Sequence, residues 1–152
     1  MHDEPSSTPC PDAALPPAHF EWPARVYWED TDAGGIVFYA NYLRFFERAR
    51  TEWLRALGLG QQALAEQTGA IFVVSRTAVD YRRPARLDDL LRLTVQLQRC
   101  GRAGFEVHQQ AWRGTELLCE GQVHVACVDR LTFRPRRMPD AVLQPLSSFA
   151  CV

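Results

Sequence analysis

The stretch DTDAGGIVFYANY, residues 30–42, decides the fold, because it separates a short extended segment from the most regular helical pattern in the chain. Two acids, Asp30 and Asp32, and two glycines, Gly34 and Gly35, interrupt its apolar residues. A helix start presents free N–H groups and the positive end of the helix dipole. We therefore expect Asp32 to do chemistry there. From spacing alone, the alternative is a turn residue that bonds its own backbone.

The helix is predicted from Asn41 to Leu57. Its apolar residues recur at spacings of three and four, which places them on one face. Asn41 is the expected N-cap, and Gly58 and Gly60 end the helix. The apolar face consists of Tyr42, Phe45, Phe46, Ala49, Trp53, Leu54 and Leu57. So many aromatic side chains indicate a core helix, not a surface one.

Alternating apolar and polar residues predict five strands, the last four joined largely by short turns. One or two further helical turns are expected between Gln61 and Gly69. A single apolar helix must lie against one face of such a sheet. The fold class is therefore α+β, a five-stranded curved antiparallel sheet wrapped around one long central helix. The expected strands are Pro23–Trp28, Ile71–Tyr81, Leu90–Gln98, Phe105–Trp112 and Glu116–Val128.

A chain of 152 residues, 47% of them hydrophobic, favours one domain with a real core. Residues 1–20 are rich in proline and read as a disordered leader. The domain is expected at 21–140, with a C-terminal tail at 141–152.

Several classes of function are excluded by what the sequence contains. The net charge of -1 argues against a nucleic-acid partner. All 17 basic residues are arginine, so a Schiff-base lysine is excluded. The sequence has no G-x-S-x-G motif of a serine hydrolase, and no histidine lies between Phe20 and Val107.

The five cysteines include no C-x-x-C pair, so neither a metal site nor a disulfide framework is expected. Cys119 and Cys127 read as small buried apolar residues, and Cys10 and Cys151 as thiols of the termini. No apolar run reaches the length of a membrane span, so no stable membrane insertion is expected. Without a signal peptide, the expected location is cytoplasmic.

The motif around Asp32 resembles the signature of the 4-hydroxybenzoyl-CoA thioesterase family. It is similar above all to the Tol-Pal system-associated acyl-CoA thioesterases within that family. The likeness covers roughly residues 22 to 140. It is carried by residues 30–37, Tyr39, Asn41–Tyr42, residues 45–50, residues 72–74, residues 81–89, residues 125–129 and residues 134–136.

This resemblance implies a hotdog fold and a cofactor-free acyl-CoA thioester hydrolase. Asp32 falls on the family's catalytic carboxylate, as nucleophile or general base. The backbone N–H of Tyr39, or of a close neighbour, falls on the donor that polarises the thioester carbonyl. The resemblance also implies a homodimer or homotetramer, and acyl carrier protein is a further candidate partner. Substrate-binding roles are expected for Gly34, Gly35, Val37 and Glu47, although Glu47 also suits an exposed partner of Arg44 or Arg50.

Coenzyme A carries phosphates, which arginine forks suit. The leading candidates are Arg99, Arg102, Arg134 and Arg136, with Arg82, Arg83, Arg86 and Arg137 as further ones. Each alone also fits an ordinary solvated charge. A second hypothesis for function comes from another class, a non-catalytic module that binds acyl-CoA or acyl carrier protein in an envelope or lipid-synthesis complex.

Overall fold

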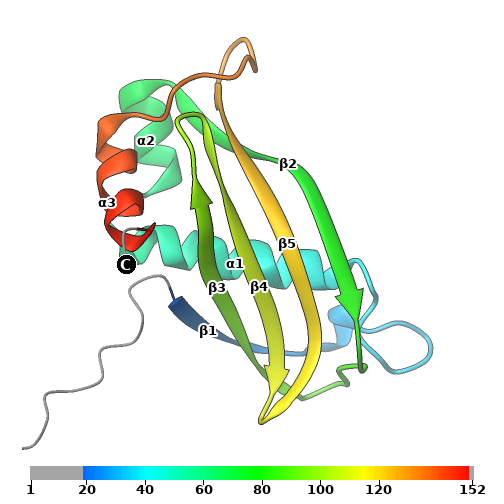
Figure 1. Ribbon diagram of the computed structural model, residues 1–152. Coiled ribbons are helices and arrows are strands. Elements are labelled where there is room, and N and C mark those ends of the chain that lie inside the picture. Colours follow the sequence, from blue (N-terminus) through cyan, green and yellow to red (C-terminus); the bar gives the residue numbers. More distant parts are fainter. Residues whose placement is uncertain (1–18, 151–152) are drawn as a thin grey trace, which may run out of the picture.

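The computed structural model describes residues 19–150, which form one layer of sheet and three α-helices (Figure 1). The predicted leader at 1–20 lies, apart from His19 and Phe20, outside the described residues, as do Cys10 and Cys151. The helices are α1 (Asn41–Ala56), α2 (Gln61–Thr68) and α3 (Asp140–Ala150), with a short 3-10 turn η1 (Trp28–Asp30). The strands are β1 (His19–Arg25), β2 (Ala70–Tyr81), β3 (Leu90–Cys100), β4 (Gly104–Arg113) and β5 (Glu116–Asp129).

The five strands form one antiparallel sheet in the order β1-β3-β4-β5-β2. The sheet curves, and α1 crosses its inner face (Figure 1). The inward-facing residues of β3, β4 and β5 alternate with partly exposed ones, as a sheet with one covered face requires. The predicted fold class is confirmed.

The apolar face of α1 packs into the core as expected. Phe45, Phe46 and Ala49 are fully buried, and Trp53 is 1% exposed. The predicted N-cap is wrong by one residue, because Ala40 is the N-cap and Asn41 opens the helix. The Asn41 side chain does not cap the helix, since its amide donates to Asp30.

The first strand lies earlier in the chain than predicted. It runs from His19 to Arg25, and Trp28 stands 81% exposed in η1, so it does not share a strand face with the buried Val26. The sequence suggested a strand starting at Pro23, because proline usually limits a strand. Since β1 is the edge strand of the sheet, Pro23 lies inside it without losing a needed hydrogen bond.

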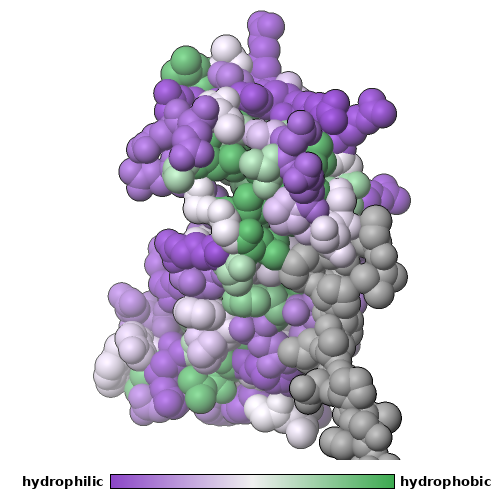
Figure 2. Space-filling model, turned by 90° about the vertical axis from the view of Figure 1, so that its left-hand side faces the viewer, coloured by the Kyte–Doolittle hydropathy of each residue, from purple (hydrophilic) through white to green (hydrophobic). Residues whose placement is uncertain are grey.

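The predicted C-terminal tail at 141–152 differs from the structure, because α3 packs against β3 and belongs to the domain. Val142 and Leu146 are fully buried, and Met138 just before the helix is 1% exposed. The helix contains Pro145, which lowers helix propensity and hid it from the sequence pattern. Figure 2 shows the side on which α2 and α3 lie, with hydrophobic residues at mid-height and hydrophilic side chains crowding the upper end.

Candidate active site

Asp30 anchors the loop that precedes α1. Its carboxylate is 4% exposed and accepts hydrogen bonds from the Tyr27 backbone N–H and the Asn41 side-chain amide, both at 2.8 Å. The Asp30 backbone oxygen accepts a third bond from the N–H of Phe38, at 2.9 Å. Bonds to a charged acceptor are stronger than neutral ones. Asp30 therefore holds the chain entering α1 in one geometry.

Asp32 lies at the exposed tip of the same loop. The Gly34 N–H donates to one oxygen of its carboxylate at 2.8 Å, and the loop closes through the Asp32 N–H to the Ile36 oxygen, at 2.9 Å. Gly35 has a φ of 77°, in the left-handed region that favours glycine. Among the described residues, the second oxygen of the Asp32 carboxylate has no partner. One oxygen is thus oriented by the loop and the other is available for chemistry.

The start of α1 lies beside this loop and offers a free donor. In the part of the chain that the structure describes, the backbone N–H of Tyr39 makes no hydrogen bond. The Tyr39 carbonyl accepts a bond from the Tyr81 hydroxyl at 2.8 Å, which fixes the orientation of this backbone segment. The N–H of Tyr39 is therefore held in place without a partner, and the oxyanion-binding role that the resemblance implies for it stays a prediction.

A cavity of about 300 Å³ opens between this helix start and the end of β2. Val37, one of the predicted substrate-binding residues, is 4% exposed and forms part of its wall. Burial raises the pKa of both Tyr42 and Tyr81, so these phenols stay protonated at neutral pH. The cavity is lined by Ile36, Val37, Tyr39, Tyr42, Tyr81, Arg82, Arg83 and Pro84.

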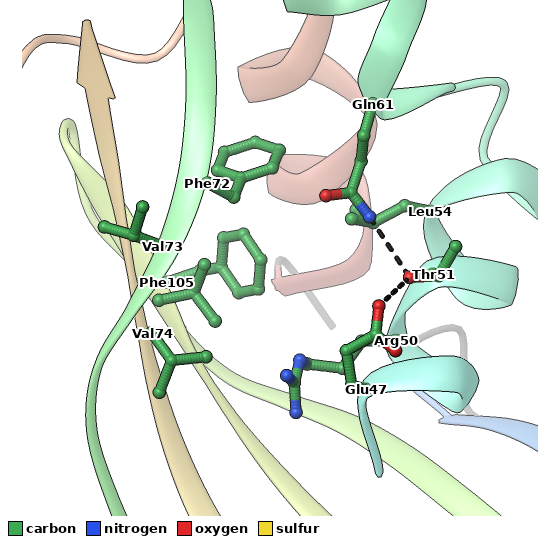
Figure 3. Close-up of a pocket in the computed structure, with 10 residues that line it drawn as sticks. Glu47, Arg50, Thr51, Leu54, Gln61, Phe72, Val73, Val74 and Phe105 are labelled. Atoms are coloured by element: carbon green, nitrogen blue, oxygen red, sulfur yellow. Dashed lines mark hydrogen bonds between the residues drawn. The ribbon is translucent and has the colours of Figure 1, made fainter. Parts of the chain in front are cut away.

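Glu47 lies further along α1, at a second cavity of about 150 Å³ between α1 and the first half of β2 (Figure 3). Its carboxylate accepts a bond from the Thr51 hydroxyl at 3.0 Å, and the Gln61 amide donates to Thr51 at 3.2 Å. Phe72 and Phe105 form the apolar side of the cavity, opposite these polar groups. With about 1.5 Å of rise per residue, Glu47 is roughly 9 Å along the helix from Asn41. In a single chain, Glu47 and Tyr39 therefore line different cavities.

Arg50 is a residue that sequence reasoning missed. It was expected on the solvated face of α1, but it turns inward and donates to the Gln109 side chain at 2.8 Å. Gln109 is fully buried, and its side-chain amide donates a hydrogen bond to the Phe46 carbonyl at 3.0 Å. Burial lowers the pKa of Arg50, partly offset by the nearby charge of Glu47. The sequence signal that could have indicated a buried partner was Gln109, a polar residue at an inward-facing position of β4, between Val107 and Ala111.

The four leading arginine candidates belong to the β3–β4 hairpin and the segment after β5, which lie at the opposite end of the sheet from the loop before α1 (Figure 1). Arg99 and Arg102 belong to the β3–β4 hairpin, where Arg99 lies 3.5 Å from the carboxylate of Glu106. Arg134 and Arg136 follow β5, and Arg136 donates to the Thr68 carbonyl at 2.8 Å. One chain does not bring these side chains to Asp32, so their role in binding substrate stays a prediction that requires a second copy.

Other arginines do lie at the Asp32 end. Arg86 forms a β-bridge with Ile36, in the Asp32 loop, and Arg82 and Arg83 line the cavity beside Tyr39. Arg82 is held by Glu120 at 3.0 Å. Arg83 makes no ion pair within residues 19–150, which leaves it available for an anion.

Residues 19–150 contain no group of three or more His, Cys, Asp or Glu side chains that could hold a metal ion. No helix in the same range is long and apolar enough to cross a membrane. Cys119 and Cys127 are both fully buried, as predicted.

Comparison with known proteins agrees with this geometry. Residues 26–146 match the family model of the thioesterase-like superfamily. The acyl-CoA thioesterase YbgC of Haemophilus influenzae is 46% identical over 123 residues, which cover 81% of this chain and 90% of the relative. The acyl-CoA thioester hydrolase YbgC of Escherichia coli O157:H7 is 44% identical over 125 residues, covering 82% and 92%. A probable thioesterase from Bartonella henselae superposes with a TM-score of 0.76 at 36% identity, covering 80% of this chain and all of that one.

These matches confirm the resemblance predicted from the motif, to the 4-hydroxybenzoyl-CoA thioesterase family and to the Tol-Pal system-associated group within it. They also confirm that the protein is a thioester hydrolase. The family model spans the Asp32 loop, the strands β2 to β5 and most of α3. The chain therefore belongs to the thioesterase-like superfamily and has its hotdog fold.

Proposed function

We propose that this protein hydrolyses acyl-CoA thioesters to the free acid and coenzyme A, with Asp32 acting on the thioester carbonyl. One observation carries the proposal. An exposed carboxylate with one oxygen oriented by Gly34, and a free backbone N–H at Tyr39, belong to one loop that Asp30 holds against the start of α1. The names of the YbgC relatives add the substrate class.

Two routes use the same two groups. In the nucleophilic route, an Asp32 oxygen attacks the carbonyl carbon, the C–S bond breaks, and the thiolate of coenzyme A leaves. Water then hydrolyses the resulting anhydride between Asp32 and the acyl group. In the general-base route, Asp32 takes a proton from the water that attacks the same carbon. In both, the N–H of Tyr39 binds the carbonyl oxygen as its negative charge grows.

The proposed binding of coenzyme A involves the predicted residues in different ways. Gly34 and Gly35 carry no side chains, so a substrate can approach the backbone of the loop closely at these two positions. Val37 forms an apolar wall at the cavity beside Tyr39. Arg83 and Arg86 are the cations available to phosphates from the same chain.

The test is thiol release from a panel of short, long and aromatic acyl-CoAs. We expect Asp32→Asn to lower kcat by about 10²–10⁴-fold, the range for loss of a general base or nucleophile, with a smaller change in KM. The matched control is Asp140→Asn, an exposed aspartate at the other end of the molecule, which keeps full activity. A blank corrects for the protein's own thiols.

Two results would count against the proposal. Release from none of the acyl-CoAs would exclude the hydrolase and favour a module that only binds the thioester. Full activity of Asp32→Asn would exclude the role given to Asp32 but leave the reaction standing.

A further inference from the structure

The loop between β5 and α3 presents two large hydrophobic side chains to solvent. Leu131 is 81% exposed and Phe133 is 64% exposed, and both lie at the tip of the turn formed by residues 130–134. This turn projects beyond the upper edge of the sheet (Figure 1). Single exposed hydrophobic residues are common, but two at a projecting tip indicate a surface that meets something.

The turn is rigid, so the exposure of these side chains is built into the fold. The Asp129 carboxylate accepts bonds from the N–H groups of Leu131 and Thr132 at 2.9 and 3.0 Å, which lower the pKa of Asp129. The Asp129 backbone is bonded to both Phe133 and Arg134. Phe133 has a φ of 56°, which is unfavourable for a bulky residue. The fold accepts this strain while it holds an aromatic ring out in water, and strain of this kind often marks a functional position.

Positive charge surrounds the tip. The Met138 N–H bonds the Arg102 carbonyl at 2.8 Å, so the β3–β4 hairpin lies beside the segment that follows β5. Residues 99–106 and 129–140 together carry six arginines and three acids, a net charge of +3, on a chain whose total is -1. Hydrophilic side chains crowd this upper end in Figure 2. The arginines are Arg99, Arg102, Arg130, Arg134, Arg136 and Arg137, and the acids are Glu106, Asp129 and Asp140.

Three of the arginines are compensated and three are not. Arg99, Arg136 and Arg137 each lie within 4.0 Å of an acid, at 3.5, 3.8 and 3.9 Å. Within the described residues, Arg102, Arg130 and Arg134 form no ion pair, and Arg130 and Arg134 directly flank the exposed side chains. An apolar tip between two free cations complements a surface that is negatively charged outside and apolar beneath.

We propose that the turn at 130–134 docks the protein on an anionic phospholipid bilayer. Leu131 and Phe133 enter the boundary between headgroups and acyl chains, while Arg130 and Arg134 meet lipid phosphates. Amphipathic surface elements bind membranes in this way, and each basic residue near an anionic leaflet adds to the attraction. Such docking is peripheral and agrees with the absence of a spanning helix in residues 19–150.

A bilayer explains the observations better than a free phosphate compound or an acidic protein. Phosphates alone would account for the arginines but not for two apolar side chains held in water. An acidic protein partner would require a broader apolar contact than a five-residue turn provides, because specific protein interfaces bury about 800 Å² per partner.

The test is flotation of the full chain with two kinds of vesicle, pure phosphatidylcholine and phosphatidylcholine mixed with phosphatidylglycerol. We expect binding to the mixed vesicles, weakened by salt, and little binding to the neutral ones. Replacing both apolar side chains, Leu131→Ser with Phe133→Ser, lowers binding by at least about 10-fold. Replacing both cations, Arg130→Gln with Arg134→Gln, does the same for the mixed vesicles. The matched control is Trp28→Ser, which removes an equally exposed aromatic side chain at the Asp32 end and leaves vesicle binding unchanged.

Circular dichroism confirms that each variant is folded, and exposed positions make unfolding unexpected. Wild-type protein that binds neither vesicle, or binds both equally, overturns the proposal. Full binding by the apolar double variant also overturns it. Displacement of the protein by added coenzyme A would show a free-phosphate site instead. A changed mass of the apolar double variant in light scattering, with vesicle binding intact, would identify the turn as a contact between copies.

Discussion

At the scale of single residues, the two acids of the D-x-D motif divide the work. Asp30 is buried, and both of its carboxylate oxygens accept hydrogen bonds, from the backbone of Tyr27 and from the side chain of Asn41 in α1. Asp32 is exposed and has one carboxylate oxygen without a partner in the described residues. The sequence could rank them only through the family resemblance, since both stand before the helix. Burial separates them on physical grounds, because a buried carboxylate with every oxygen bonded cannot reach a substrate.

Replacing each of the two loop glycines by alanine is expected to have a different effect. Gly35 has a φ of 77°, and an added Cβ would meet no atom within 4 Å. We therefore expect Gly35→Ala to lower the free energy of unfolding by about 1–2 kcal/mol through backbone strain alone. Gly34 has no such φ, but an added Cβ would lie 3.1 Å from the Asp32 carboxylate. Gly34→Ala is expected to lower kcat without lowering stability.

Urea unfolding and the thiol-release assay distinguish the two effects. If Gly34→Ala keeps the kcat of the wild type, the carboxylate of Asp32 does not need the position that the loop gives it.

At the scale of elements, the sequence predicted α1, α2 and the strands β2 to β5 within a residue or two. Their periodicities are regular, and Gly58, Gly69 and Gly114 mark their ends with left-handed backbone. It placed β1 too late in the chain and missed α3, and the two errors share one reason. Pro23 and Pro145 lie inside elements that proline usually interrupts, and only an edge position or a packed core makes that acceptable.

The inclusion of α3 in the core predicts a large cost for truncating its buried face. Leu146 is fully buried, so Leu146→Ala should lower the free energy of unfolding by about 2–5 kcal/mol. Gln144→Ala, on the exposed face of the same helix, should change it by less than about 0.5 kcal/mol. Urea denaturation measures both. Equal values for the two variants would show that α3 does not contribute to the core.

The core strand β5 carries a prediction on alkaline stability. Burial raises the pKa of the Cys119 thiol from 9.0 to about 12. In the unfolded chain this thiol ionises near pH 9, while in the folded protein it stays neutral, so the unfolded state releases more protons. The contribution of the Cys119 thiol to the free energy of unfolding is therefore fully present below pH 9 and falls as the pH rises from 9 toward 12.

Cys119→Ala removes this contribution. We expect the variant to have a lower free energy of unfolding than the wild type by an amount that is constant between pH 6 and pH 8. Above pH 9 this difference shrinks, because ionisation of the Cys119 thiol in the unfolded chain lowers the stability of the wild type alone. Denaturation at a series of pH values measures the difference. A constant difference across the whole range would show that Cys119 ionises alike in both states.

At the scale of the whole molecule, the predicted residues fall into separate regions of one chain. Asp32 and Tyr39 share one end of the sheet, Glu47 lies midway along α1, and the four leading arginines lie at the far end. We infer that a second copy, paired along the edge strand β2, brings the Glu47 cavity of one chain beside the Tyr39 cavity of the other. Much of β2 is exposed, and an antiparallel partner strand would bring the start of one β2 beside the end of the other.

This association predicts a dimer or tetramer in light scattering and a matched pair of variants. Thr77→Asp places a charge on the exposed part of β2 and should shift the mass toward the monomer while lowering thioester hydrolysis. Thr115→Asp makes the same change in the exposed β4–β5 turn and should alter neither. A monomeric wild type with full activity would refute the shared site.

The sequence by itself determined the fold class, the family and the loop proposed to carry the chemistry, because periodicity and a long motif are local properties of the chain. It also identified Asp32, Gly34, Gly35 and Tyr39 as parts of one segment, and contiguity keeps such residues together in any fold. Only the tertiary structure decided what distant residues do. It turned Arg50 inward to Gln109, buried α3 against β3, and carried Arg99 and Arg134 away from Asp32. These outcomes depend on which faces meet when the sheet curves around α1, and that packing is not written in any single stretch of sequence.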